Sequence, residues 1–196
     1  MKNIIILIAM TIILAACSSG ELSRAKAKKM IAQKYGFPLV EYRNYDELTL
    51  SGMSKKYLNN GMTTMETYYR NEFGKQKQKQ RQVITEEGNT YVVKTITNQI
   101  WGGSTKQYAT NLQKIDEITG IRTNDDNTRA TVELSVVRYN STPWGDEDKY
   151  INEGDVLKKS IKFEKYDDGW RITGPKKLGR CMSFADTSKD LKNLLK

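Results

Sequence analysis

The sequence predicts an α+β fold in which helical elements come first and an antiparallel β-sheet follows. Helical periodicity is strongest in residues 23–35, whereas residues 130–136 alternate between apolar and polar side chains. The hydrophobic content of 38% includes Tyr, Trp, Val and Ile at positions suited to strands, which indicates a folded, surface-rich domain. We therefore expect a helical part at residues 23–98 and an antiparallel β part with a C-terminal helix at residues 99–196.

The N-terminal segment has the pattern of a secretory signal peptide. Lys2 supplies the positive start, and an apolar run with small residues at its end follows. The run Leu14-Ala15-Ala16-Cys17 is similar to the lipobox of bacterial lipoprotein precursors. This resemblance implies that residues 1–16 are removed, that the thiol of Cys17 is diacylated, and that residues 17–22 form a lipidated tether.

The apolar run is too short to be a membrane span. At ~1.5 Å per residue it covers roughly 20 Å, against a hydrocarbon core of about 30 Å. The alternative is an ordinary secretory signal cut near Ala16, with Cys17 a plain thiol. If the lipobox is used, the protein is held in the cell envelope by lipid. Since Ser18 follows Cys17, the resemblance implies the outer membrane in a Gram-negative host.

Residues 23–35 carry a full set of helix signals. Ser23 is a good N-cap, Gly36 suits a left-handed stop, and Pro38 prevents continuation. The face expected to be buried carries Ala27, Ile31 and Tyr35. The other faces include Arg24, Lys26, Lys28 and Lys29. Next to a lipid anchor these four cations can rest on anionic headgroups; the alternative is a solvated helix face.

The next segments are less regular. Residues 39–45 alternate as a strand, and residues 48–58 suit a short helix that ends at an Asn-Asn-Gly turn. The β-branched and aromatic content of residues 62–69 favours a strand, although the spacing of its apolar side chains also suits a helix.

Residues 75–81 alternate cations with glutamine and contain no apolar side chain. On a strand this pattern puts every charge on one face, whereas in a loop it makes a flexible basic finger. The cations are Lys75, Lys77, Lys79 and Arg81. We expect them either to contact a partner or to form a solvated wing.

The order of elements across residues 23–95 resembles a winged helix. The run Thr85-Glu86-Glu87-Gly88 with Tyr91 is similar to the Leu-Thr-x-x-Gly-x-x-Tyr pattern that follows the wing in many such domains. The expected recognition helix, near residues 50–60, offers only Lys55 and Lys56 as cations. DNA reading is therefore not implied, and export also argues against nucleic acid as a partner.

The second half is more clearly β. Residues 91–101 and 112–122 are strand-like, and a turn cluster at residues 124–127 separates the latter from the alternating strand at 130–136. Residues 156–173 read as a hairpin. Its four-residue loop sets Phe163 opposite Ile172 and Lys165 opposite Trp170. A short helix is expected at residues 188–196.

The absence of histidine removes many mechanisms. It excludes Ser-His-Asp and Cys-His catalysis and histidine-ligated metal sites. Once Cys17 is acylated, Cys181 has no second thiol in the chain, so it is buried, free or paired between chains. The acidic loop at residues 146–155 is expected to be solvated, and calcium binding by its carboxylates is the alternative. No cofactor motif or metal site is predicted.

The chain is basic, with a net charge of +9 at pH 7. In an envelope, anionic partners include lipid headgroups, peptidoglycan carboxylates and acidic proteins. The alternative is that the positive surface charge serves only solubility. Trp101 and Trp144 stand beside glycines, where they are either exposed for contact or folded back over the sheet.

These observations predict a membrane-anchored envelope lipoprotein with a non-catalytic binding or assembly role. Acylated Cys17 would contact membrane lipid, and an envelope protein or anionic headgroups would be the further partner. The alternatives are a His-free hydrolase that uses a carboxylate pair on peptidoglycan or lipid, and an exclusion or immunity lipoprotein of a mobile element. The sequence thus leaves enzymatic activity open but favours a binding protein.

Overall fold

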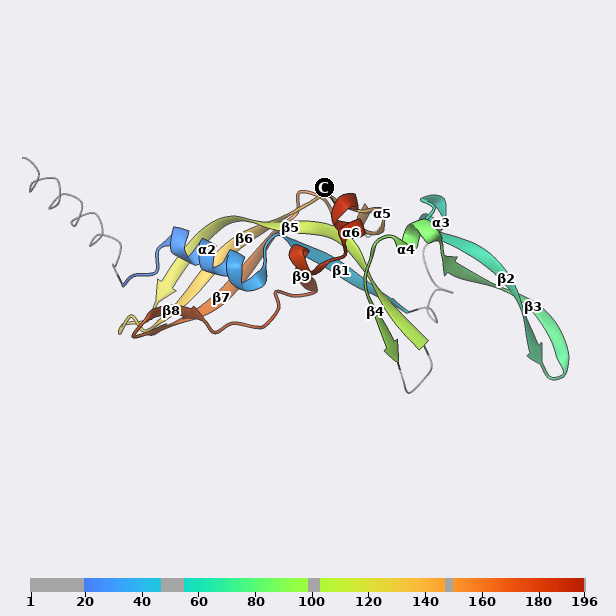
Figure 1. Ribbon diagram of the computed structural model, residues 1–196, viewed down its shortest axis with the longest axis horizontal. Helices are drawn as coiled ribbons and strands as arrows, with labels where there is room; N and C mark the ends of the chain where they lie inside the picture. The colour runs from blue at the N-terminus through green and yellow to red at the C-terminus, as the bar shows by residue number, and fades with distance from the viewer. Residues whose placement is uncertain (1–19, 47–54, 99–102, 147–149, 196) are drawn as a thin grey trace, which may run out of the picture.

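The computed structural model of the protein describes residues 20–46, 55–98, 103–146 and 150–195. Its elements, shown in Figure 1, are α2 (Arg24–Tyr35), β1 (Leu39–Asp46), α3 (Lys55–Asn59), β2 (Thr63–Glu72), β3 (Lys75–Ile84), α4 (Glu86–Asn89), β4 (Val92–Asn98), β5 (Gly103–Thr123), β6 (Arg129–Tyr139), α5 (Pro143–Asp146), β7 (Val156–Tyr166), β8 (Gly169–Ile172), β9 (Cys181–Ser183), η2 (Phe184–Asp186) and α6 (Lys189–Leu194). The expected α+β class is wrong. The protein is mainly β, and among the helices of the described residues only α2 is longer than six residues.

The long strand β5 organises the main sheet because it pairs with three other strands, β1, β4 and β6. The strand order is β8-β7-β6-β5-β1-β9, with β4 also paired to β5, and all pairs are antiparallel. β4 pairs with residues 103–108 of β5 and β6 with residues 112–123, while β1 pairs with residues 105–113. β4 and β6 therefore follow one another along one edge of β5, and β1 occupies the other edge. At about 3.3 Å per residue, β5 extends over at most about 70 Å.

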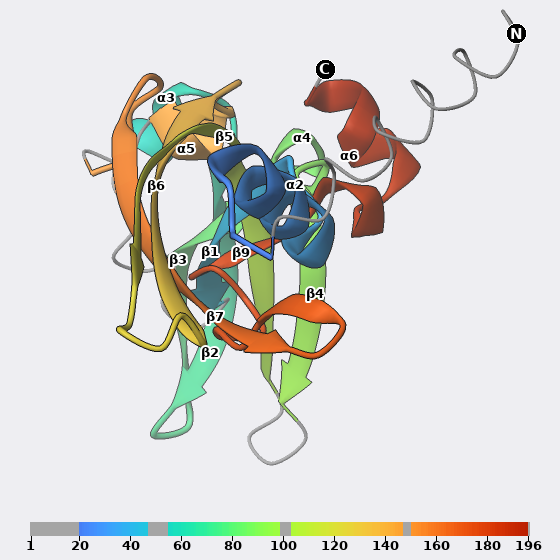
Figure 2. The ribbon, with the colours of Figure 1, turned by 90° about the vertical axis from the view of Figure 1, so that its left-hand side faces the viewer.

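The main sheet curls around helix α2. Register shifts in the β5–β6 and β1–β5 pairs bend the strands, and α2 lies inside the resulting curve (Figure 2). The helix buries Ala27, Ile31 and Tyr35, as expected. The facing sheet residues are buried in the same core: Ala130, Val132, Leu134, Val136, Ile161 and Phe163. The predicted helix, with its Ser23 cap and left-handed Gly36, and the alternation of residues 130–136 are both confirmed.

A second, smaller core joins the C-terminal helix to the sheet. Val40, Ala109 and Leu112 from β1 and β5 pack with Leu191 and Leu195. Successive residues of a strand point to opposite faces, so Val40 serves this core while its neighbour in β1 serves the main one. The short helix expected near the C-terminus is present as α6, with Ser188 as its N-cap.

In the last part of the chain the predicted hairpin register is confirmed, and burial is the correct one of the expectations for Cys181. The β7–β8 hairpin pairs Phe163 with Ile172 and Lys165 with Trp170. Cys181, on β9, is buried as a free thiol. Burial raises the pKa of this thiol to about 12, so it is an inert part of the main core rather than a reactive group.

The N-terminal part is not organised as a winged helix, and this part of the fold prediction is also wrong. β1 belongs to the main sheet through its pairs with β5 and β9. β2 and β3 pair only with each other among the described residues. Of the helix expected at residues 48–58, only Lys55–Asn59 is described and helical; residues 47–54 lie outside the described part. Local periodicity shows that a segment is a strand but not which distant strand it pairs with.

Candidate binding surfaces

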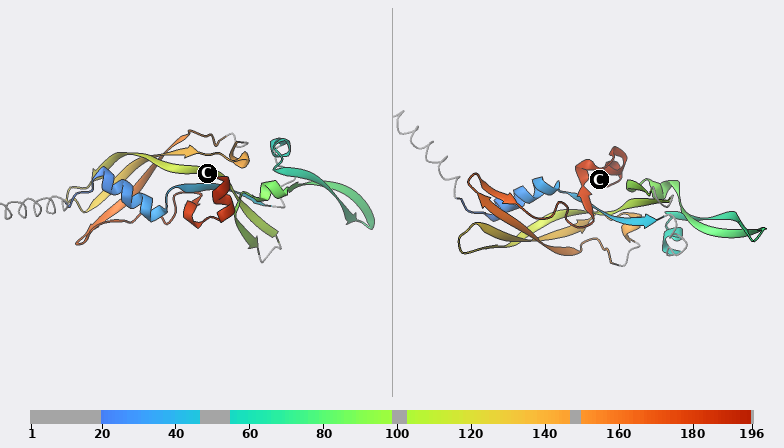
Figure 3. Two further views of the ribbon diagram at one scale, coloured as in Figure 1. Left: turned by 45° about the horizontal axis from the view of Figure 1, so that its top comes forward. Right: turned by 90° about the horizontal axis from the view of Figure 1, so that it is seen from below.

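The β2–β3 hairpin projects from the body as a long arm, which Figures 1 and 3 show from three directions. The strands pair without a break from Thr63 with Ile84 to Glu72 with Lys75. Phe73 and Gly74 form the tip, with φ of 53° and 76°, the positive values that a two-residue type I′ turn requires. At about 3.3 Å per residue, each ten-residue strand is roughly 33 Å long.

The arm has two chemically different faces because side chains alternate along each strand. The neutral face consists of Met65, Thr67, Tyr69, Asn71, Gln76, Gln78 and Gln80. The charged face consists of Glu66, Tyr68, Arg70, Glu72, Lys75, Lys77, Lys79 and Arg81. The predicted basic segment is thus a strand that puts its four cations on one face.

The charged face is net positive. Five cations face two carboxylates: Glu66 accepts from Arg81 Nε at 2.7 Å, and Glu72 accepts from Lys79 and lies 3.4 Å from Lys77 Nζ. The hydrogen bond from Lys79 lowers the pKa of Glu72. Arg81 also lies over the ring of Tyr68. Both carboxylates are therefore already engaged, and the excess positive charge faces solvent.

The neutral face and the tip expose large apolar side chains. Met65 is 47% exposed, Tyr69 is 66% exposed and Phe73 at the tip is fully exposed. Single exposed apolar residues are ordinary, but these three follow one another along an arm that lacks a core of its own. A hairpin of two strands is only marginally stable in water. Contact with a partner would cover these side chains and stabilise the arm.

The base of the arm is held firmly to β5 by an aromatic cluster. Trp144 stacks on Tyr108, with ring centroids 4.4 Å apart, and lies 4.9 Å from Tyr57. Its Nε1 donates to the carbonyl of Gly88 at 3.2 Å. Met62, at the start of the arm, is fully buried in the same cluster. This packing fixes the direction in which the arm leaves the body.

Trp144 is therefore not available for contact. It is fully buried, and of the two expectations for it, folding back over the sheet is the correct one. Gly145 makes this possible, because a Cβ there would lie 2.2 Å from the carbonyl oxygen of Thr110. The other candidate tryptophan, Trp101, and the predicted lipidation residue Cys17 lie outside the described residues.

The chain enters the fold at the end opposite the arm (Figure 1). Trp170 Nε1 donates to the carbonyl of Gly20 at 2.9 Å, and Leu22 is buried in the main core. The expected tether of residues 17–22 is thus already docked on the body from Gly20 onward. The four predicted headgroup-contact residues, Arg24, Lys26, Lys28 and Lys29, are exposed on α2 near this end. Of these, Arg24 and Lys28 donate to the carbonyls of Thr119 and Asp116 in β5.

A buried ion cluster joins β1, β5 and β6. Arg138 makes a two-pronged contact with Glu41, with both N–O distances 2.8 Å, and also contacts Asp155 at 2.9 Å. Gln113 Nε2 donates to Glu41 at 2.6 Å. Burial raises the pKa of Glu41, but hydrogen bonds from Arg138 and Gln113 outweigh it and the pKa is lowered.

The same cluster keeps Asp155 ionised. A hydrogen bond from the backbone of Asn152, together with Arg138, lowers its pKa. Glu41 and Asp155 are thus both carboxylates at neutral pH, and general acid catalysis requires a protonated partner. In the described residues no group of three or more Cys, Asp or Glu side chains is arranged to hold a metal ion. Of the predicted acidic loop, residues 147–149 lie outside this part of the chain.

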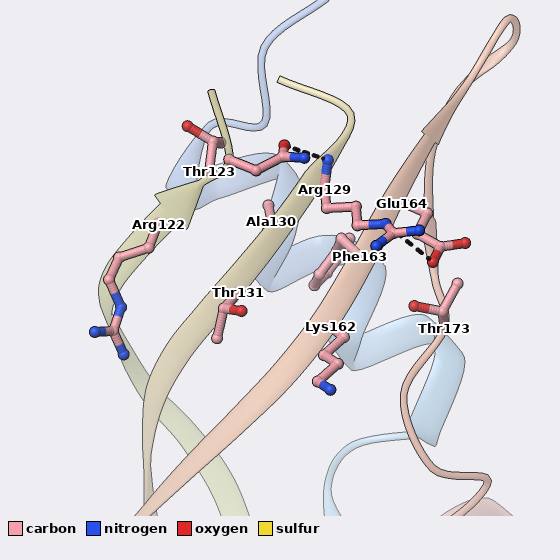
Figure 4. A pocket seen from close by; sticks show the side chains of 10 residues that line it. Arg122, Thr123, Arg129, Ala130, Thr131, Lys162, Phe163, Glu164 and Thr173 are labelled. Carbon is pink, nitrogen blue, oxygen red and sulfur yellow. Dashed lines mark hydrogen bonds and ion pairs between the residues drawn. The ribbon is translucent and has the colours of Figure 1, made fainter. Parts of the chain in front are cut away.

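A hollow of about 500 Å³ lies near the β5–β6 turn. Figure 4 shows it rimmed by Arg122, Arg129 and Lys162, with α2 behind the strands. Two carboxylates already engage the arginines: Glu133 accepts from Arg122, and Glu164 lies 3.8 Å from Arg129. The charged side chains around it are largely solvent-exposed. This hollow is therefore a shallow part of the surface rather than an enclosed site.

Comparison with known proteins finds no family model, no curated protein and no solved structure that matches this chain. No helix in the described part of the chain is both long and apolar enough to cross a membrane. The arm is the candidate binding surface that the sequence predicted least completely. Its signal was the charge alternation of residues 75–81 beside an Asn-Glu-Phe-Gly turn, which together indicate a hairpin.

Proposed function

We propose that this protein is a lipid-anchored lipoprotein of a bacterial cell envelope, with a non-catalytic binding or assembly role, and that the β2–β3 arm is its binding element. The observation that carries this proposal is that the point of chain entry and the arm lie at opposite ends of the molecule. The chain enters the fold at Gly20, at one end, and the arm projects from the other (Figure 1). An anchor at Cys17 would hold the first end at the membrane and present the arm away from it.

Chain length supports close contact between the body and the membrane. Only Ser18 and Ser19 lie between Cys17 and Gly20, and the three extended residue steps from Cys17 to Gly20 reach about 10 Å. Two or three acyl chains on Cys17 would hold durably, because each buried CH₂ contributes about 0.8 kcal/mol. Under this proposal the basic residues of α2 lie within reach of anionic headgroups, while the arm reaches another envelope component.

The ion cluster supports a binding role over acid-base catalysis. A His-free hydrolase needs two convergent carboxylates with separated pKa values. Glu41 and Asp155 do converge, but they share Arg138, and the pKa of each is lowered. Their geometry suits a structural ion cluster that holds neighbouring strands together.

Palmitate labelling tests the anchor. Cells expressing the wild-type chain should incorporate labelled palmitate into it, and the protein should sediment with membranes, in the outer-membrane fraction of a Gram-negative host. Cys17→Ala should abolish labelling and leave an unprocessed or soluble form. Cys17→Ala protein that is of mature size and remains in membranes at full yield would contradict the proposal.

A further inference from the structure

We propose that the free edge of β3 binds an extended acidic segment of an envelope protein as a third strand of the arm. This inference rests on the proposed function, because it identifies the chemistry of the partner that the arm would meet. Three features of the described arm carry it: an open strand edge, a regular charge spacing and the marginal stability of a two-stranded sheet.

The open edge is β3 itself. Among the described residues β3 pairs only with β2, along all ten of its residues. The backbone groups on its other side are therefore available to another strand, which is the basis of recognition by strand addition. A third strand would also add backbone hydrogen bonds to an arm that is only marginally stable with two strands.

The charge spacing selects the partner. Lys75, Lys77, Lys79 and Arg81 recur at every second residue, on one face of β3. Every second residue of a strand is about 6.6 Å from the last. A neighbouring strand with a carboxylate at every second residue would place one opposite each cation. Opposite charges at facing positions stabilise a pair of strands, and like charges destabilise it.

The same reasoning disfavours a second copy at this edge in the β3-to-β3 arrangement, since lysines would face lysines. A lipid surface is disfavoured by position, because the arm and the point of chain entry lie at opposite ends of the body (Figure 1). Both remain outcomes that the experiment distinguishes.

The probe is a ten-residue synthetic peptide in which Glu alternates with Thr, tested against the full-length protein purified in detergent. A peptide of the same composition with its five Glu residues clustered is the charge control. Two further peptides carry N-methyl groups on either the odd or the even residues, which blocks one backbone edge without changing charge. Isothermal titration and infrared spectroscopy of isotope-labelled peptide report affinity and strand formation.

We expect the alternating peptide to bind about tenfold or more tightly than the clustered one, from several facing charge pairs. One N-methylated peptide should lose binding and the other should keep it. The variant Lys75→Gln/Lys77→Gln/Lys79→Gln/Arg81→Gln should lose binding. The matched control Lys158→Gln/Lys162→Gln/Lys176→Gln/Lys177→Gln, which removes four exposed cations elsewhere, should bind as the wild type does.

Equal affinity for the alternating and clustered peptides, or binding by both N-methylated peptides, would overturn strand addition. Binding to anionic vesicles through the β3 cations, with no peptide binding, would assign the edge to lipid instead. A dimer in multi-angle light scattering that the β3 variant converts to monomer would assign it to a second copy. Palmitate labelling is independent of all these results, so failure here leaves the proposed anchor standing.

Discussion

The clearest energetic prediction concerns the buried ion cluster at Arg138. Only 8% of the Arg138 side chain and 13% of the Glu41 side chain are exposed, so water cannot replace either partner. The substitution Arg138→Met removes the guanidinium but keeps most of the volume of the side chain. It leaves the Glu41 carboxylate buried beside Gln113 without its cation. Breaking a buried pair in this way costs about 3–5 kcal/mol of unfolding free energy.

The double variant Glu41→Leu/Arg138→Met separates the charge from the packing. It removes both charges, and replacement of a buried pair by apolar residues is often close to neutral. Gln113 Nε2 loses its acceptor, which costs about 1–2 kcal/mol. We therefore expect the double variant to be more stable than Arg138→Met by about 2 kcal/mol.

The pH dependence has a defined sign. In the wild type the pKa of Glu41 is lowered on folding, so its contribution to stability is present above the ordinary carboxyl range and is lost as pH falls through the folded pKa. In Arg138→Met, burial without the cation raises the pKa of Glu41. The destabilisation caused by this substitution should therefore be largest near neutral pH. It should be smaller near about pH 4, because Glu41 of the Arg138→Met variant is then protonated and no buried charge is left unpaired.

Urea unfolding followed by tryptophan fluorescence measures all three proteins at both pH values. Additive losses, with the double variant less stable than Arg138→Met, would refute the reasoning. So would a destabilisation that does not change with pH, because the cost would then come from packing rather than from the buried charge.

Three further outcomes follow from the surface and the core. Replacing the four β3 cations by Gln should lower the melting temperature by less than about 5 °C in a thermal melt, because exposed ion pairs contribute little; a much larger loss would show that the arm is part of the stabilising structure. Cys181 should resist Ellman's reagent at about pH 8 until the protein is unfolded, since its pKa is raised to about 12; rapid reaction of the native thiol would contradict its burial. Protein carrying Cys17→Ala should bind anionic but not neutral vesicles, more weakly in salt; charge-independent binding would exclude headgroup contact by Arg24, Lys26, Lys28 and Lys29.

Sequence reasoning succeeded where the signal is local. The helix that starts after Ser23 and stops at Gly36 is set by caps within its own segment. The register of Phe163 with Ile172 follows from a short turn and a shared buried face. In both cases the residues that determine the structure are close together in the chain.

It failed where the determining contact is distant. β1 pairs with β5 and β9, and Leu39 lies opposite Gln113, which is far from it in the sequence. β2 and most of β3 have no buried face, so their sequence carries no inside-outside pattern. Trp144 resembled an exposed loop residue because the close approach of Gly145 to Thr110 is invisible without the fold.

The central claim, that the body is held at the membrane while the arm points away, is tested most directly by the depth of two fluorescent labels. Glu21→Cys places an exposed thiol at the point of chain entry and Phe73→Cys places one at the tip of the arm, and the buried Cys181 should not react. The acylated proteins are reconstituted in liposomes that contain a headgroup quencher. The proposal predicts strong quenching at position 21 and none at position 73, with vesicle association at moderate salt lost in Cys17→Ala. Quenching at position 73 equal to that at position 21 would contradict it.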